Sequence, residues 1–170
     1  SANYLLGTSY YQIDDLVNSE KYLLMSLSIF PGSRASKHTL AMIYDQNGSW
    51  IKSDSLYLEL ISTDTTDAQA YNNFAYSLVE RNDNLELALE MSIIANRIQP
   101  KSAPYLDTLG WIYFKLEQYD KALKIVLSIE NSPVKDQALA LAGEIEEQFL
   151  GNIDNALKYY YQLLSECESS

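Results

Sequence analysis

The chain of 170 residues contains a single histidine, His38. An imidazole can act as a general base or as a metal ligand, so His38 is the first residue to consider for chemistry. A zinc motif needs further histidine or cysteine ligands at short spacing, and no such partner lies near His38 in the sequence. We therefore expect His38 to line a groove or to lie at the surface, without a catalytic or metal-binding role.

Pairs of neighbouring carboxylates are the second possible source of acid–base chemistry. Asp14-Asp15 and Glu146-Glu147 are such pairs, but adjacent residues of a helix point about 100° apart, so their carboxylates do not converge. The six glycines form no phosphate-binding loop, and neither Ser33 nor Ser49 has the strand–turn–helix setting of a serine nucleophile. The sequence predicts no active site, no cofactor and no metal ion, so we expect that the chain is not an enzyme.

A regular spacing of small residues is the strongest pattern in the sequence. Leu6-Gly7, Leu40-Ala41, Phe74-Ala75 and Leu109-Gly110 each place a small residue behind an apolar one, and the small residues are 34, 34 and 35 positions apart. Self-similarity at a fixed period of this length is typical of stacked-repeat proteins. Repeated units must therefore position any functional side chain, and the expected function moves from catalysis to binding.

Each period contains two helical patterns joined by a turn. In the clearest copy, the first helix has apolar or small residues at i, i+3, i+4 and i+7, which are Leu106, Leu109, Gly110 and Tyr113. After a turn around Glu117-Gln118, the second helix is marked by Ala122, Val126 and Ile129. A glycine inside a helix costs up to about 1 kcal/mol relative to alanine, so Gly110 predicts a close approach of the partner helix.

These residues, together with Pro100 at the end of the preceding unit, resemble the tetratricopeptide repeat. The resemblance covers nearly the whole chain and implies an all-α fold, a right-handed α-solenoid of about five helix-turn-helix repeats in one domain, 1–170. The expected repeats span 1–33, 34–67, 68–102, 103–136 and 137–170, and the turn of the fifth is one or two residues longer than the family pattern. We expect a larger side chain at Gly110 to overpack the junction of the third and fourth repeats. Because the chain begins inside a repeat, we also expect it to be a piece of a longer protein.

Turn-forming and capping residues agree with these boundaries. Proline cannot continue the hydrogen-bond ladder of a helix, so Pro31 and Pro100 predict the ends of second helices. The other residues of this kind mark turns within repeats or helix N-termini: Asn47-Gly48, Asn82-Asp83-Asn84, Ser132 before Pro133, and Asn152 or Asp154. No stretch alternates with a period of two residues, so essentially no strand is expected.

The net charge of −11 restricts the class of partner. Nucleic acids and anionic membrane surfaces are bound through Lys and Arg, so neither is expected to bind. No apolar run approaches the roughly 20 residues that cross a bilayer, so we do not expect this chain to insert into a membrane. An acidic surface keeps an exposed solenoid soluble, and it also attracts basic partners by long-range steering. The single Cys167 excludes an intramolecular disulfide and leaves the compartment undefined.

In the tetratricopeptide family, a second stripe on each first helix lines a concave groove that holds extended peptides. Carried over position by position, the resemblance implies an aromatic groove with few charges. Its implied lining residues are Tyr4, Thr8, Tyr11, His38, Met42, Asp45, Asn72, Tyr76, Glu80, Asp107, Trp111 and Lys115. Phe114 falls on the same stripe, and the alternative for Trp111 and Phe114 is that they pack against a neighbouring helix. The acidic members Asp45, Glu80 and Asp107 favour a partner with Lys or Arg between apolar anchors.

Three functions stay open on the sequence alone. The leading hypothesis is a non-catalytic module that binds a protein or peptide in this groove. The second is a structural spacer or self-association scaffold in a larger assembly, and the third is the recruiting arm of an enzyme whose catalytic domain lies outside the 170 residues. The run Asn72–Tyr76 followed by Tyr105–Trp111 is similar to a pairing in bacterial envelope-associated repeat proteins. This narrower resemblance implies a bacterial protein, either cytoplasmic or associated with the periplasm and envelope.

Overall fold

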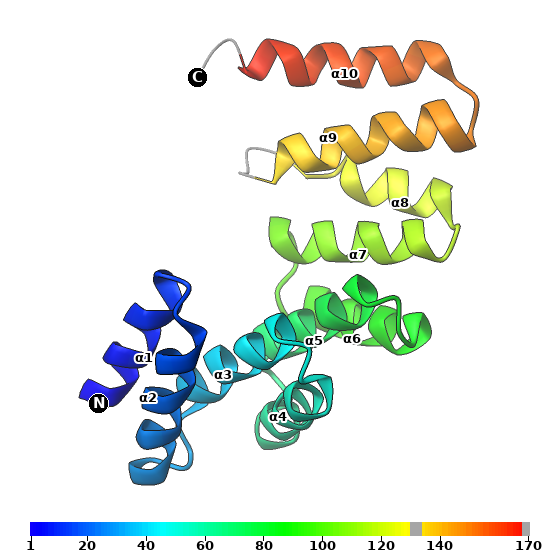
Figure 1. Ribbon diagram of the computed structural model, residues 1–170. Coiled ribbons are helices and arrows are strands. Elements are labelled where there is room, and N and C mark those ends of the chain that lie inside the picture. The colour runs from blue at the N-terminus through cyan, green and yellow to red at the C-terminus, as the bar shows by residue number, and fades with distance from the viewer. Residues whose placement is uncertain (130–133, 168–170) are drawn as a thin grey trace. The chain divides into compact units, whose positions relative to one another are not determined.

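The computed structural model describes residues 1–129 and 134–167, with side chains through residue 163. Within this part of the chain all regular structure is helical and no strand is present. The elements are α1 (Ala2–Gln12), α2 (Leu16–Ile29), α3 (Arg34–Gln46), α4 (Trp50–Thr63), α5 (Ala68–Glu80), α6 (Leu85–Ile98), α7 (Ala103–Lys115), α8 (Tyr119–Val126), α9 (Lys135–Glu144), the π-helical segment η1 (Ile145–Phe149) and α10 (Ile153–Cys167) (Figure 1). The prediction of an all-α fold built from helix pairs is confirmed.

The first helices of three repeats begin where the sequence pattern places them. The helices α3, α5 and α7 begin at Arg34, Ala68 and Ala103, which are the first residues of the expected second, third and fourth repeats. The helix α9 begins at Lys135, two residues before the position expected for the fifth repeat. The first helices of the repeats therefore begin at the same interval at which the small residues recur in the sequence.

The helices form two compact units, residues 1–74 and 75–170, and the division falls inside α5. In the first unit, α1 packs on α2 and α3 packs on α4, while α2 also packs on α3. In the second unit, α7 packs on α8 and α9 packs on α10, while α6 packs on α7 and α8 on α9. Each unit therefore consists of helix hairpins that stack on their neighbours in chain order, as solenoid repeats do.

The predicted turns within repeats contain residues that tolerate a left-handed backbone. Gly48, between α3 and α4, has a φ of 73°, and Asn82 and Asn84, between α5 and α6, have φ of 52° and 42°. Glycine and asparagine adopt this conformation at the least steric cost. Asn84 also caps α6, because its side chain accepts a hydrogen bond from the Leu87 N–H at 3.3 Å.

The last helix is capped by one of its two predicted residues. Asn152 accepts a hydrogen bond from the Asn155 N–H at 3.4 Å, so Asn152 and not Asp154 is the capping residue of α10. This side-chain oxygen satisfies one of the free N–H groups in the first turn of the helix. The expected cap at Ser132 and Pro133 lies outside the described residues.

Small residues lie where the two helices of a repeat cross. A Cβ atom on Gly7 would come 2.7 Å from Cγ of Leu23, and one on Gly110 would come 2.6 Å from Cγ1 of Val126. Gly143 is likewise packed against the ring of Tyr160. Real Cβ contacts do not become this short, so a side chain at these positions would displace its neighbour. The predicted close approach of a partner helix to Gly110 is confirmed.

The partner of Gly110 differs from the expected one. Val126 lies on α8, so Gly110 packs inside the fourth repeat and not at the junction of the third and fourth repeats. Only residues 116–118 separate α7 from α8. This short turn holds the two helices together as a hairpin, and the small residue accommodates the helix of its own repeat.

The second helix of the fourth repeat is shorter than the apolar pattern predicted. The helix α8 ends at Val126, three residues before Ile129. The Ile129 N–H donates to the Val126 carbonyl at 3.2 Å in a tighter turn. Ile129 is nevertheless buried with Val126, Ala138 and Ala142 in the apolar core of the second unit. The spacing therefore marked a buried residue correctly and the end of the helix wrongly.

An extra residue in the fifth repeat is absorbed inside a helix. The small residues of the paired helices are 12 positions apart in the fourth repeat, at Gly110 and Ala122, but 13 apart in the fifth, at Gly143 and Ala156. In η1 the Leu150 N–H donates to the carbonyl five residues earlier at 3.0 Å. A π-helical turn accommodates one residue more than an α-helical turn. This accounts for the additional length expected in the fifth repeat.

Candidate functional site

The predicted groove residues on α1 are held by contacts within the first unit. Tyr4 and Tyr11 are half-buried and pack against the apolar core of that unit. The core consists of Leu23, Leu40, Ile43 and Tyr44. The Tyr11 hydroxyl accepts a hydrogen bond from Gln46 Nε2 at 3.1 Å, and the Thr8 hydroxyl donates to the Tyr4 carbonyl at 3.1 Å. These side chains therefore contribute to packing within the first unit.

Asp45 on α3 bonds to the second helix of its own repeat. Its carboxylate accepts hydrogen bonds from Ser53 Oγ at 2.8 Å and from Tyr57 Oη at 3.3 Å, and both donors lie on α4. Tyr57 is buried, and its burial together with the Asp45 charge raises the pKa of its hydroxyl. Met42, on the same helix, is half-buried. Both oxygens of Asp45 are thus engaged inside the α3–α4 hairpin.

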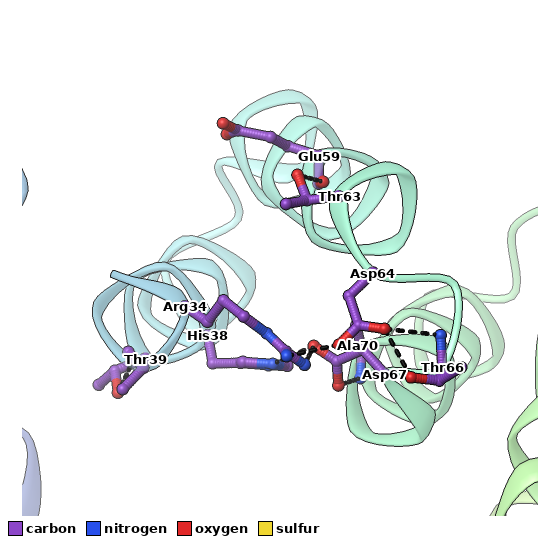
Figure 2. A network of polar contacts seen from close by, with 10 residues as sticks. Arg34, His38, Thr39, Glu59, Thr63, Asp64, Thr66, Asp67 and Ala70 are labelled. Atoms are coloured by element: carbon purple, nitrogen blue, oxygen red, sulfur yellow. Dashed lines mark hydrogen bonds and ion pairs between the residues drawn. The ribbon is translucent and has the colours of Figure 1, made fainter. Parts of the chain in front are cut away.

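His38 on α3 lies in a polar network at the start of α5 (Figure 2). Its Nε2 is 2.9 Å from Oδ2 of Asp67, and the Arg34 guanidinium lies 2.6 Å from the same oxygen. Oδ1 of Asp67 accepts a hydrogen bond from the Ala70 N–H at 3.1 Å, so Asp67 also caps α5. Arg34 pairs with Asp64 as well. His38 itself is only 9 % exposed, so the structure places it between helices.

Asp67 is expected to make the stability of the first unit sensitive to acid. Burial alone raises the pKa of its carboxyl, but hydrogen bonds from Arg34, the Ala70 N–H and His38 outweigh burial and hold that pKa below its usual value. Such a group stabilises the folded state above its unfolded pKa of about 3.9, and the contribution is lost as the pH falls through the lower folded pKa. We expect the free energy of unfolding to fall more steeply below about pH 4 in the natural chain than in Asp67→Asn. Urea denaturation over a pH series measures this, and parallel curves would contradict it.

Two polar atoms of predicted groove residues are buried without a partner among the described residues. They are Nδ1 of His38 and Oδ1 of Asn72, and Asn72 lies on the part of α5 that belongs to the first unit. Buried polar groups usually have a hydrogen-bond partner. Because both atoms are closed to solvent, neither offers an open contact for a docking peptide.

The remaining predicted residues come together in the second unit. Tyr76 on α5 is 43 % exposed, and its ring lies 5.6 Å from the half-buried Trp111 ring on α7 at an interplanar angle of 53°. Lys115, one turn after Trp111, places its Nζ 5.9 Å from the centre of the indole. We call Tyr76, Trp111 and Lys115 the aromatic surface.

Two carboxylates, those of Glu80 and Asp107, raise the pKa of the tyrosine in the aromatic surface. Burial, the charges of Glu80 and Asp107, and a hydrogen bond with Glu80 raise the pKa of the Tyr76 hydroxyl. Glu80 is exposed at the end of α5, whereas Asp107 is half-buried on α7, and burial raises the pKa of its carboxyl. The second unit therefore combines exposed aromatic area with negative charge.

Phe114 packs in a separate aromatic cluster. Its ring centre lies 5.9 Å from that of Tyr119 and 5.5 Å from that of Phe149, and the rings of Tyr119 and Phe149 stack at 4.4 Å. Of the two alternatives for Phe114, the structure shows the one in which it packs against neighbouring elements. Phe149 belongs to η1, and no sequence pattern marked it because its position follows from the π-helical turn.

Arg34 and Asp67 are the polar residues that the sequence analysis missed. The usable signal was a capping pattern, because Asp67 immediately precedes the expected start of the third repeat, and aspartate is a favoured N-cap. The bond to His38 had no such signal, since 29 positions separate the two residues. Among the described residues no group of three or more side chains is arranged to hold a metal ion.

None of the helices described here has the length and apolar character required to cross a membrane.

The sequence model of the tetratricopeptide repeat matches residues 103–127, which include α7 and α8. A thermophilic tetratricopeptide-repeat protein of Thermus thermophilus has the same fold, with 21 % identity and a TM-score of 0.76 over 96 % of this chain and 89 % of that one. Residues 103–127 thus match one tetratricopeptide repeat, and the chain has the fold of tetratricopeptide-repeat proteins. No curated protein sequence matches it significantly.

Two further solved structures resemble this chain over almost its entire length. A crystal structure of MamA is 22 % identical, with a TM-score of 0.80 over 96 % of this chain and 95 % of that one. PilF of Pseudomonas aeruginosa is 18 % identical, with a TM-score of 0.82 over 97 % of this chain and 74 % of its own. At these identities the likeness establishes the solenoid fold of helix pairs.

Proposed function

We propose that this chain is a non-catalytic interaction module that binds an extended peptide or a partner helix across the aromatic surface. Proteins of this fold are typically scaffolds for other proteins. The observation that carries the proposal is the pair of rings, Tyr76 and Trp111, which lie 5.6 Å apart with Tyr76 exposed. Tyrosine and tryptophan are favoured anchors because they bring large contact area with few torsions to freeze.

The proposal concentrates binding on the second unit. The predicted groove residues of the first unit are engaged in its own packing: Tyr11 bonds to Gln46, Asp45 to Ser53 and Tyr57. A polar side chain that is already hydrogen-bonded within the protein has less capacity to form hydrogen bonds with a partner. Tyr76 and Trp111 instead lie on the first helices of successive repeats, α5 and α7, which is where the family binds peptides.

Removing both rings is expected to weaken peptide binding about 30-fold or more. A true anchor contributes on the order of 2 kcal/mol, which corresponds to about 30-fold in the dissociation constant. Peptides would be selected from a random display library on the natural chain, and their dissociation constants measured by fluorescence anisotropy with the natural chain and with Tyr76→Ala/Trp111→Ala. Circular dichroism would establish that the variant is folded.

A matched control removes the same two residue types elsewhere. Trp50 on α4 and Tyr161 on α10 are both exposed, so Trp50→Ala/Tyr161→Ala should leave the dissociation constants within about twofold. Equal affinity of the natural chain and the Tyr76→Ala/Trp111→Ala variant would refute binding at the aromatic surface. Equal losses in both double variants would point to a general effect on folding.

Self-association is the second candidate function. The side chains of Ile153, Leu157 and Tyr161 are exposed on α10 at i, i+4 and i+8, so they share one face of that helix. Contiguous exposed apolar side chains favour contact with another protein surface. A mass that rises with concentration in sedimentation equilibrium, and that returns to the monomer value in Leu157→Ser, would support this candidate. A constant monomer mass would exclude it.

A further inference from the structure

The three acidic residues expected to favour a basic partner have different surroundings in the structure. Both oxygens of Asp45 accept hydrogen bonds from its own hairpin. Glu80 is exposed to solvent and bonds to the Tyr76 hydroxyl. Asp107 differs from both, because it is half-buried and makes no hydrogen bond or ion pair with any described residue. Of the three residues, Asp107 is therefore the one whose carboxylate oxygens can still accept hydrogen bonds from a partner.

An unpaired, partly desolvated carboxylate costs free energy in the unbound protein. Burial raises the pKa of Asp107, which means that the ionised form is disfavoured at this position. Asp107 is not among the residues whose unpaired oxygens are closed to solvent, so a partner can reach its carboxylate. A cationic group placed against the carboxylate by a partner would supply the missing bonds, and it would do so in a setting where a charge-assisted hydrogen bond is stronger than in water.

The Trp111 ring, on the same helix as Asp107, already accepts a cation. Asp107 lies one helical turn before Trp111, so their side chains share a face of α7. The Asp107 charge also helps to raise the pKa of the Tyr76 hydroxyl. The ammonium group of Lys115 lies 5.9 Å from the centre of the Trp111 ring. A positive charge over an aromatic face is attracted by the electrons of the ring.

We propose that Asp107, Tyr76 and Trp111 form a subsite for one arginine side chain of the bound peptide. This inference rests on the proposed function, because the subsite belongs to the aromatic surface. The guanidinium is planar, so it can lie against a ring and donate two parallel hydrogen bonds to one carboxylate. A lysine ammonium offers neither the plane nor the parallel donors, and its tighter hydration makes it harder to desolvate. The subsite therefore selects arginine over lysine, and a basic partner suits the net charge of −11.

The test compares peptides selected on two forms of the protein. A random display library would be panned on the natural chain and on Asp107→Asn, and arginine should be enriched only on the natural chain. For one selected peptide, versions with arginine, lysine and glutamine at the enriched position would be titrated by fluorescence anisotropy. Asp107→Asn should weaken the arginine peptide about tenfold and leave the glutamine peptide unchanged. The natural chain should bind the lysine peptide more weakly than the arginine peptide.

Two controls separate the subsite from a structural role of Asp107. Asp120→Asn removes an exposed carboxylate from α8 and should leave all three affinities unchanged. Asp107→Asn should be at least as stable as the natural chain in urea, because it removes a disfavoured charge; a marked loss of stability would show that Asp107 is needed for folding and would overturn the proposal.

Different results would overturn the arginine subsite and the proposed peptide-binding function. Peptides that require Tyr76 and Trp111 but show no arginine enrichment, or that lose equal affinity with arginine and glutamine in Asp107→Asn, would overturn the arginine subsite alone. Peptides whose dissociation constants are the same for the natural chain and for Tyr76→Ala/Trp111→Ala would overturn both proposals.

Discussion

Replacing Gly110 with leucine is expected to lower the free energy of unfolding by about 1–3 kcal/mol. Even the first added carbon would come 2.6 Å from Cγ1 of Val126, and leucine adds three further carbons in the same space. Overpacking a core typically costs about 1–3 kcal/mol, which exceeds the gain of up to about 1 kcal/mol from replacing a helical glycine. Val126 is buried and β-branched, so it has few rotamers by which to move away. Urea denaturation followed by circular dichroism measures the loss.

The same substitution at Gly32 provides the control. A Cβ atom there would meet nothing within 4 Å, and Gly32 does not require a left-handed backbone. Gly32→Leu should therefore change the free energy of unfolding by less than about 0.5 kcal/mol. If Gly110→Leu unfolds at the same urea concentration as Gly32→Leu, then α7 and α8 do not pack as closely as described.

Replacing Asp67 with alanine is expected to lower the free energy of unfolding by about 2–5 kcal/mol. Loss of the cap on α5 accounts for about 1 kcal/mol. Loss of the bond to His38 leaves Nε2 buried without a partner, which costs about 1–3 kcal/mol. The pair with the half-exposed Arg34 adds at most about 1 kcal/mol. Urea denaturation at neutral pH would give the total.

Asp64→Ala is the matched control for Asp67→Ala. Asp64 also pairs with Arg34, but its side chain is 30 % exposed and its other oxygen accepts hydrogen bonds from Thr66. Its loss should cost less than about 1 kcal/mol, as for other surface pairs. A cost for Asp64→Ala that equals the cost for Asp67→Ala would show that the pair with Arg34, and not the buried contact to His38, is what stabilises this network.

Local features of the sequence predicted the helix boundaries well. Pro31 and Pro100 follow the ends of α2 and α6 at Ile29 and Ile98, because a proline ring excludes continuation of a helix wherever it occurs. Gly110 marked a close approach because the missing side chain has a steric meaning that does not depend on distant residues. Such signals depend on the backbone within one or two turns, and the sequence displays them directly.

Contacts between distant positions were not predictable in the same way. His38 was expected to line a groove or lie at the surface, whereas it bonds to Asp67, 29 positions away. The groove stripe identified Tyr76 and Trp111 as neighbours, yet it included Phe114, whose ring packs on Tyr119 and Phe149. A spacing rule gives the direction of a side chain from its own helix. It does not say which neighbour occupies that direction.

The π-helical segment η1 changes which neighbours one uninterrupted helix can reach. Before it, Ala138 and Ala142 pack in the core with Val126 of α8; at its last residue, Phe149 stacks on Tyr119, the first residue of that same helix. One additional residue rotates everything downstream by about 100° around the helix axis. The fifth repeat thus accommodates its extra residue by rotating the helix, and not by lengthening a loop. Both α9 and η1 remain in contact with α8.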